Sequence, residues 1–225
     1  TDDNVVFAPH NYNDSIQGGT IAEGFAAAAT SAATFGTTFW IGEYGWFGDP
    51  ATDAAKVTEY AAQEDKYRVG GTWWQWKQAC GDPHSVGARD GEPSAALVHL
   101  HHTACPGDVN QGPVTEFVKI LSRAYPRFAP GQLTTLTSDP ATGAFTVAGS
   151  ATSADGGSDL DVWIPDTGQG EPKLDSCGLG PITIRSVEGG YRATGEVQGP
   201  TYAMRSAAPG STASSTATCP ATAVG

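Results

Sequence analysis

Three short apolar runs, each followed by a stretch with helical periodicity, occupy the first 125 residues. The apolar runs cover 5–8, 39–42 and 71–76, and the helical stretches cover 21–35, 53–68 and 113–125. Strands that alternate with helices in this order form parallel sheets with crossover helices. We therefore predict a βαβαβα arrangement, whose last helix begins at Pro113 because proline suits the first helical turn.

The remainder of the chain has a different pattern. Between Cys80 and Asn110 there is no periodicity, and an insertion of this length in a compact domain is usually a functional loop. After Pro126, short β-type runs alternate with Gly, Pro, Asp and Ser and predict a small antiparallel β-sandwich. The runs cover 145–148, 160–164, 182–187, 191–197 and 201–204. The domains we expect are 1–128, 129–205 and a tail rich in Ala, Ser and Thr at 206–225.

The charge and hydropathy of the chain exclude two classes of protein. Twelve Lys and Arg against 24 Asp and Glu give a net charge of −12, and the basic residues form no cluster, so we expect no nucleic acid as partner. No window approaches about 18 consecutive apolar residues, so we expect no membrane-spanning helix.

The four cysteines predict the compartment. They allow three pairings, and their positions favour Cys80 with Cys105 and Cys177 with Cys219. Two disulfides, a charged fraction of only 16% and 29 glycines are typical of a secreted, extracellular protein. Because the chain begins at Thr1 and enters a strand-like run almost at once, we expect it to be processed or truncated.

Polar or aromatic groups follow each apolar run of the first part. The runs lead into 9–12 (Pro-His-Asn-Tyr), 42–45 (Gly-Glu-Tyr-Gly) and 73–76 (Trp-Trp-Gln-Trp). In α/β barrels the active site lies at this end of the strands. Glu43 is poorly placed for a surface charge, at the edge of a buried strand, and is therefore a candidate functional residue.

The residue types suit glycoside hydrolysis. The retaining route needs a carboxylate nucleophile, a second carboxyl group about 5–5.5 Å away as acid/base, and a platform for the sugar ring. Glu43 and the tryptophans supply the first and the third, because indole rings offer flat apolar faces to a pyranose. Polar groups that could reach sugar hydroxyls are Gln75, Lys77, His10 and Asn11. This set suits a carbohydrate better than a phosphate or a metal.

Several residues have simpler structural interpretations. Glu43 alone could be a strand-end carboxylate without function. Its place at the same end of the predicted strands as His10, Tyr12 and Trp76 argues against that. Trp73 should point opposite to its neighbours and belong to the core.

Other charged or metal-ligating residues are interpreted as structural or solvated. The histidines 99, 101 and 102 near Cys105 do not fit a tight tetrahedral set, so no metal is expected. The segment 64–66 (Glu-Asp-Lys) is predicted to be a solvated helix face. The long-loop residues interpreted as solvated, with contact to an aglycone as the alternative, are Asp82, His84, Asp90 and Glu92.

The strand-end motifs resemble part of a known barrel. Pro-His-x-Tyr, Gly-Glu-x-Gly and Trp-x-x-Trp at 9–12, 42–45 and 73–76 resemble strands six, seven and eight of glycoside hydrolase family 5. The segments 120–127 and 139–143 resemble its endoglycoceramidase branch, whose members release glycans from glycosphingolipids. The implied fold class is α/β, the carboxyl-terminal portion of a (β/α)8 TIM barrel followed by a small antiparallel β-sandwich.

The resemblance also implies roles for single residues. Glu43 would be the catalytic nucleophile, Tyr12 would hydrogen-bond that nucleophile, and His10 would line the site. Trp76 matches the aromatic side chain beneath the sugar at the cleavage point. Trp74 shares its face by strand alternation and is the second choice. No cofactor is implied.

One motif of the family is missing. The Asn-Glu pair that supplies the acid/base does not occur in the sequence, and a complete barrel needs about 250 residues. We therefore expect the carboxyl-terminal part of a retaining glycosidase, with the missing amino-terminal half of the barrel as partner and a carbohydrate or glycolipid as substrate. Endo-acting cleavage of glycosphingolipids is favoured. The alternatives are a β-1,4-glucanase of the cellulase type and a non-catalytic carbohydrate-binding fragment.

Overall fold

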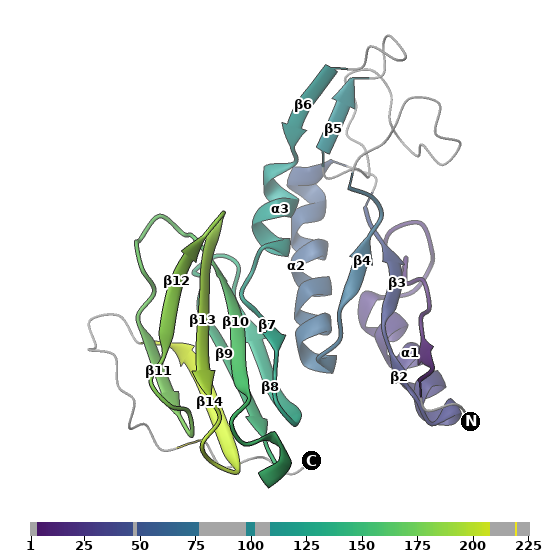
Figure 1. Ribbon diagram of the computed structural model, residues 1–225. Coiled ribbons are helices and arrows are strands. Elements are labelled where there is room, and N and C mark those ends of the chain that lie inside the picture. Colours follow the sequence, from purple (N-terminus) through teal and green to yellow (C-terminus); the bar gives the residue numbers. More distant parts are fainter. Residues whose placement is uncertain (1–3, 47–48, 77–97, 102–108, 208–218, 220–225) are drawn as a thin grey trace. The chain divides into compact units, whose positions relative to one another are not determined.

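The chain divides into two compact units, Thr1–Leu121 and Ser122–Gly225 (Figure 1). Each unit has a hydrophobic core of its own. The computed structural model describes residues 4–46, 49–76, 98–101, 109–207 and 219. The fold is mixed α/β, and most of its strand pairs are antiparallel.

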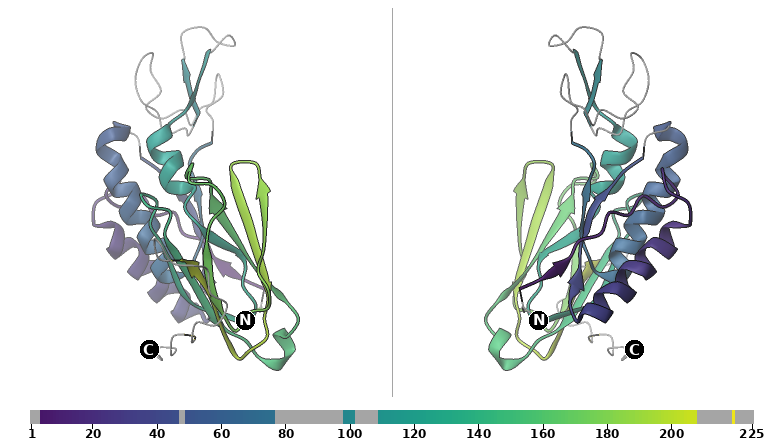
Figure 2. Two further views of the ribbon diagram at one scale, coloured as in Figure 1. Left: turned by 90° about the vertical axis from the view of Figure 1, so that its left-hand side faces the viewer. Right: turned by 90° about the vertical axis from the view of Figure 1, so that its right-hand side faces the viewer.

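Parallel strands with intervening helices form the first unit, as predicted. β1 pairs in parallel with β2, and β3 pairs in parallel with β4. The helices α1 and α2 lie on the same side of these strands (Figure 2). In chain order the elements are β1 (Val6–Phe7), α1 (Ile21–Phe35), β2 (Thr38–Phe39), β3 (Ile41–Tyr44), α2 (Pro50–Tyr67), β4 (Gly71–Trp73), β5 (Val98–His101), β6 (Val109–Pro113) and α3 (Thr115–Leu121).

Local signals fix both ends of α1. The Thr20 side chain accepts the backbone N–H of Glu23, and the Glu23 carboxylate accepts the backbone N–H of Thr20 at 2.7 Å, which is a capping box. The helix stops at Gly36, whose φ of 66° lies in the left-handed region that glycine adopts without strain.

An aromatic cluster joins the helices to the strands. Phe25 of α1 meets the ring of Tyr60 edge-on, with centroids 4.9 Å apart, and Tyr44 of β3 stacks on the same ring at 4.1 Å. Trp46, just beyond β3, meets Tyr60 edge-on at 5.4 Å. Because buried rings dominate the apolar area of a small core, Tyr60 fixes α2 against the end of β3.

The inward side of α2 also carries carboxylates. Glu64 and Asp65 are buried, so the prediction of a solvated face at 64–66 is wrong for these two residues and correct for Lys66. For Glu64 the reason is the close approach of β4: a Cβ atom at Gly71 would lie only 2.7 Å from Oε1 of Glu64. This face of the helix therefore meets the strand and not the solvent.

Two predicted segments of the first unit differ from the structure. The helix predicted at 113–125 is shorter, because Pro113 ends β6 and Tyr125 belongs to a strand of the second unit. The interval 80–110, predicted to be a loop without structure, contains β5 and the start of β6, which pair antiparallel. The pairing of β5 with β6 leaves no helical or turn pattern in the local sequence. A prediction from periodicity therefore misses these two strands.

The second unit consists of two four-stranded antiparallel sheets, with strand orders β12-β13-β10-β7 and β11-β14-β9-β8. Residues from both sheets, among them Val147, Val162 and Tyr202, form one core. All five predicted runs are strands, whereas β7, β8 and β11 were not predicted. The elements are β7 (Tyr125–Phe128), β8 (Gln132–Ser138), β9 (Phe145–Ser150), η1 (Ser153–Asp155), β10 (Asp159–Pro165), β11 (Leu174–Cys177), β12 (Thr183–Val187), β13 (Gly190–Glu196) and β14 (Thr201–Ser206).

A disulfide anchors the tail of the chain. Cys177 at the end of β11 is bonded to Cys219, with Cα atoms 5.3 Å apart, which confirms this predicted pair. The predicted pair Cys80 and Cys105 lies outside the described residues. Within the described part of the chain, no helix has the length and apolar character needed to cross a membrane.

We predict that Gly24→Ala destabilises the first unit. A Cβ atom at Gly24 would lie 2.2 Å from Oδ1 of Asn11, so the added methyl group must displace the segment that leads into Tyr12. Such overpacking costs about 1–3 kcal/mol, which outweighs the gain of at most about 1 kcal/mol from alanine in a helix. The free energy of unfolding, measured with denaturant, should therefore fall.

Gly18→Ala is the matched control, because nothing lies within 4 Å of a Cβ atom at that position. Equal stability of the two variants would contradict the prediction.

Candidate active site

Backbone pairing brings the segment after β1 to the end of β3. The N–H of Gly42 donates to Pro9 O at 2.8 Å, the N–H of Asn11 donates to Glu43 O at 2.9 Å, and His10 pairs with Glu43 in parallel register. Side chains of paired residues in a parallel ladder lie next to one another. The pairing therefore places His10 beside Glu43.

Two side chains contact the same oxygen of Glu43. The Tyr12 hydroxyl donates to Oε2 at 3.1 Å, and Nδ1 of His10 lies 3.1 Å from that atom. The side chain of Glu43 is 29% exposed and that of His10 is 54% exposed. The carboxylate is thus held through one oxygen while it stays accessible to a solute, which is the arrangement a nucleophile or a base requires.

Tyr12 is a permanent hydrogen-bond donor in this arrangement. Its ring is buried, and burial raises the pKa of the phenol well above its ordinary value. The charge of Glu43 and the hydrogen bond to it raise that pKa further. Tyr12 therefore keeps its proton across the physiological range and donates a hydrogen bond to the carboxylate.

The two glycines that flank Glu43 allow close backbone approach. A Cβ atom at Gly42 would lie 3.1 Å from Cδ2 of His10, and one at Gly45 would lie 2.4 Å from the carbonyl oxygen of Trp74. A larger residue would displace His10 at the first position and the backbone of Trp74 at the second. This is a physical reason for the Gly-Glu-x-Gly pattern in this chain.

The tryptophans divide between core and surface. Trp73 packs against Phe117 with centroids 5.1 Å apart and belongs to the core, as predicted. β4 ends at Trp73, so the alternation used to place Trp74 and Trp76 on one strand face does not extend to them. Trp74 is half-buried, its peptide bond to Gln75 is cis, and Trp76 is 66% exposed.

Some predicted residues lie elsewhere. Asn11 is buried against Gly24 of α1, so it does not reach a sugar from the open side. Trp46 was not predicted at all, although it is buried and its indole N–H donates to Asp14 O at 3.1 Å. A single tryptophan after a strand has no periodicity or motif that could have identified it.

Other predicted groups lie outside the described residues. They are Lys77, Asp82, His84, Asp90, Glu92 and His102, together with the side chains of His99 and His101. Among the described residues, no group of three or more His, Cys, Asp or Glu could hold a metal ion.

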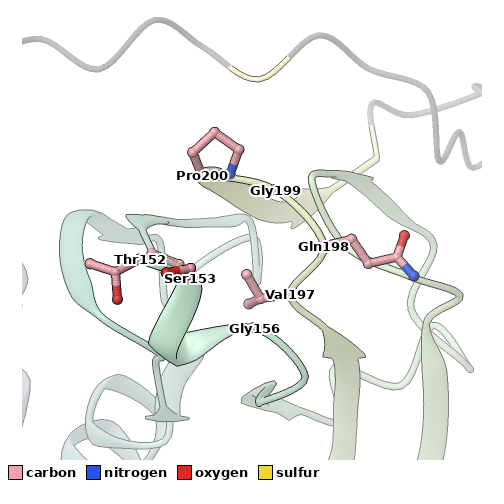
Figure 3. Close-up of a pocket in the computed structure, with 8 residues that line it drawn as sticks. Thr152, Ser153, Gly156, Val197, Gln198, Gly199 and Pro200 are labelled. Atoms are coloured by element: carbon pink, nitrogen blue, oxygen red, sulfur yellow. The ribbon is translucent and has the colours of Figure 1, made fainter.

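A hollow in the second unit is chemically different. It lies between η1 and the turn after β13, has a volume of about 300 Å³, and is lined by uncharged residues (Figure 3). Thr152 and Ser153 line one side, and Val197, Gln198 and Pro200 belong to the facing segment. It offers hydroxyl and amide groups but no carboxylate. It is therefore a weaker candidate than the surroundings of Glu43 for acid/base or nucleophilic chemistry.

Comparison with known proteins identifies structural relatives. No protein-family model and no curated protein matches the chain. The crystal structure of an endogalactoceramidase matches 92% of this chain and 42% of its own, with a TM-score of 0.75 and 36% identity. The resemblance to the endoglycoceramidase-like enzymes of glycoside hydrolase family 5 is confirmed.

More distant structures share the fold. Endo-glycoceramidase II from Rhodococcus sp. matches 92% of this chain and 44% of its own, with a TM-score of 0.61 and 15% identity. Sterylglucosidase 1 from Cryptococcus neoformans matches 84% of this chain and 32% of its own, with a TM-score of 0.56 and 12% identity. The chain thus spans less than half the length of these endoglycoceramidase-like relatives.

We predict that Glu43→Gln makes Tyr12 easier to ionise. The substitution removes the charge and the carboxylate acceptor that raise the pKa of Tyr12, while burial remains and keeps that pKa above its ordinary value. The midpoint of Tyr12 ionisation, followed by NMR of ¹³Cζ-labelled tyrosine, should fall by about one pH unit or more.

Glu59→Gln removes the same charge from an exposed position on α2 and is the control. If both variants leave the midpoint unchanged, Tyr12 does not interact with Glu43 in solution.

Proposed function

We propose that this chain is the nucleophile-bearing, carboxyl-terminal portion of a retaining glycoside hydrolase. The observation that carries the proposal is the contact of both Tyr12 and His10 with Oε2 of Glu43. The 36% identity to an endogalactoceramidase over 92% of the chain supports it. On this proposal β1, β3 and β4 are barrel strands six to eight, and the second unit is a β-sandwich domain.

Glu43 acts first as the nucleophile. Its oxygen Oε1, the one not used by the hydrogen bond from Tyr12 to Oε2, attacks the anomeric carbon while the bond from that carbon to the aglycone oxygen breaks. A second carboxyl group gives its proton to the departing oxygen. The products are a glycosyl ester on Glu43 and the released alcohol, and Oε2 becomes the carbonyl oxygen of the ester.

Water completes the cycle. The second carboxyl group, now ionised, takes a proton from a water molecule whose oxygen attacks the anomeric carbon. Glu43 leaves as a carboxylate, and the Tyr12 hydroxyl stabilises the charge that returns to Oε2. Two inversions at one carbon give net retention. Since the family's Asn-Glu pair does not occur in this sequence, we assign the acid/base to the amino-terminal half of the barrel.

The tryptophans beyond β4 complete the proposed site. Trp76 is exposed and follows the strand next to that of Glu43, which suits a platform under the sugar. Trp74 is the second choice, because its backbone adjoins Gly45. Neither ring needs to carry charge, since its role is to offer an apolar face to the ring hydrogens.

The proposed substrate is a glycosphingolipid, cleaved at the β-glycosidic bond in an endo-acting manner. Two of the structural relatives are by name an endogalactoceramidase and an endo-glycoceramidase, and the endogalactoceramidase is the more similar of the two. We further propose that the protein is secreted, which the Cys177–Cys219 disulfide supports because such bonds persist in oxidising compartments.

We predict that Glu43→Gln abolishes turnover in the full-length protein. An amide is not a nucleophile, so glycan release from a glycosylceramide should fall by about 10⁴-fold or more. In the wild type, a 2-deoxy-2-fluoro-β-glycosyl fluoride should attach its sugar to Glu43, as detected by mass spectrometry of peptides. Fluoride leaves without a proton, so this labelling does not depend on the acid/base.

Glu59→Gln on the exposed face of α2 should keep full activity. Near-native activity of Glu43→Gln, or a label on another residue, would refute the assignment of Glu43.

We also predict that lipid-linked glycans are preferred over soluble ones. Initial rates should be compared on a galactosylceramide, a glucosylceramide and a soluble β-1,4-glucan, at equal concentrations of the cleavable bond. Faster cleavage of the glucan would favour the cellulase-type alternative. Tight glycan binding without cleavage of any of the three would favour a non-catalytic binding fragment.

A further inference from the structure

The turn at residues 12–17 carries Tyr12 to Glu43. The carbonyl oxygen of Tyr12 accepts the N–H groups of Ser15 at 3.0 Å and Gln17 at 3.1 Å. Asp14, inside the turn, has a φ of 58°, which is in the left-handed region. Aspartate enters that region more readily than most residues other than glycine, because its short polar side chain can hydrogen-bond locally. Contacts from outside the turn add to these internal hydrogen bonds.

Two side chains from other elements hold the carbonyl oxygen of Asp14. The indole Nε1–H of Trp46 donates to it at 3.1 Å, and Nζ of Lys56 donates to it at 3.2 Å. A third contact ties the turn to the same region, because the Ser15 hydroxyl donates to Gly45 O at 2.5 Å. The turn is thus attached both to the segment that follows Glu43 and to α2.

The two donors differ in rigidity. Trp46 is 2% exposed, and its ring packs against Tyr60 at 5.4 Å and Trp73 at 6.2 Å. Lys56 is 38% exposed, and its ammonium group also lies 3.6 Å from Oδ1 of Asp14. Because a partly exposed ion pair contributes little, Trp46 should be the stronger of the two anchors.

We propose that Trp46 and Lys56 are positioning residues for the reaction of Glu43. By holding the Asp14 carbonyl they fix the turn and keep the Tyr12 hydroxyl on Oε2 of Glu43. They act through Tyr12 and not on the substrate. The inference rests on the proposed function, since the placement of Tyr12 affects a rate only if Glu43 is the nucleophile.

Conservative substitutions separate this role from packing. Trp46→Phe removes the N–H and keeps an aromatic ring, and Lys56→Met removes the charge and keeps the side-chain length. In the full-length protein, kcat should fall about tenfold for Trp46→Phe and less for Lys56→Met, with KM little changed, because small misplacements of a catalytic group cost this much. Lys56→Arg should restore activity. Lys66→Met, on the same helix but over the ring of Tyr67, should have no effect.

A double-mutant cycle with Tyr12→Phe gives the decisive result. If Trp46 acts through Tyr12, Trp46→Phe should slow the wild type but cause little further loss in the Tyr12→Phe background. The rate of labelling by the 2-fluoro glycosyl fluoride serves as a second measure of the same cycle. Losses that multiply in full would overturn the proposal, because they would show that Trp46 acts independently of Tyr12.

A readout without turnover distinguishes failure of this inference from failure of the proposed function. The ¹³Cζ resonance of Tyr12 should shift in Trp46→Phe and in Lys56→Met and stay unchanged in Lys66→Met. If it shifts while Glu43→Gln keeps its activity, the anchoring of Tyr12 stands and the assignment of Glu43 fails. If it stays unchanged in both anchor variants, the positioning role is refuted whatever the activity.

Discussion

The parallel hydrogen bonds between residues 9–11 and the end of β3 set the geometry on which the proposed site depends. They join Gly42 to Pro9 and Asn11 to Glu43. Side chains alternate along a strand, so a slip of one residue would turn the carboxylate and its partner to opposite faces. Glycine at position 42 permits this register, because a Cβ atom there would lie 3.1 Å from Cδ2 of His10. The short distance between His10 and Glu43 therefore follows first from the backbone pairing and only then from the side-chain conformations.

Helix α2 makes this register rigid. The ring of Tyr60 contacts Phe25 of α1, Tyr44 of β3 and Trp46 beyond it, so one side chain links both helices to the strand that carries Glu43. Burial raises the pKa of Tyr60, with the nearby carboxylate of Glu64 as the next cause, and the phenol stays neutral inside the cluster. A site built on such a packed frame keeps its geometry without help from the ligand.

The sequence predicts the secondary structure that depends on neighbouring residues. It does not predict the contacts between residues that are distant in the chain. The apolar runs and the helix 21–35 follow from periodicity, and Glu43 follows from its place at a strand end. Contacts across the fold have no such signal. The charges of Glu64 and Asp65 do not say which side of α2 meets β4, and nothing near Trp46 indicates that its indole holds a turn more than thirty residues away. The pairing of Tyr12 with Glu43 came from family resemblance and not from pattern.

The two partners of Oε2 differ in kind, and this difference has a mechanistic consequence. Tyr12 is buried, neutral and always a donor, whereas His10 is largely exposed and donates only while its Nδ1 carries a proton. If the imidazole alone held Glu43, the orientation of the carboxylate would depend on a side chain that is 54% exposed to solvent. With the phenol as the permanent partner, Oε2 stays engaged and Oε1 remains the oxygen that can form a bond. The turn that places Tyr12 therefore matters more to the orientation of Glu43 than the contact with the exposed His10 does.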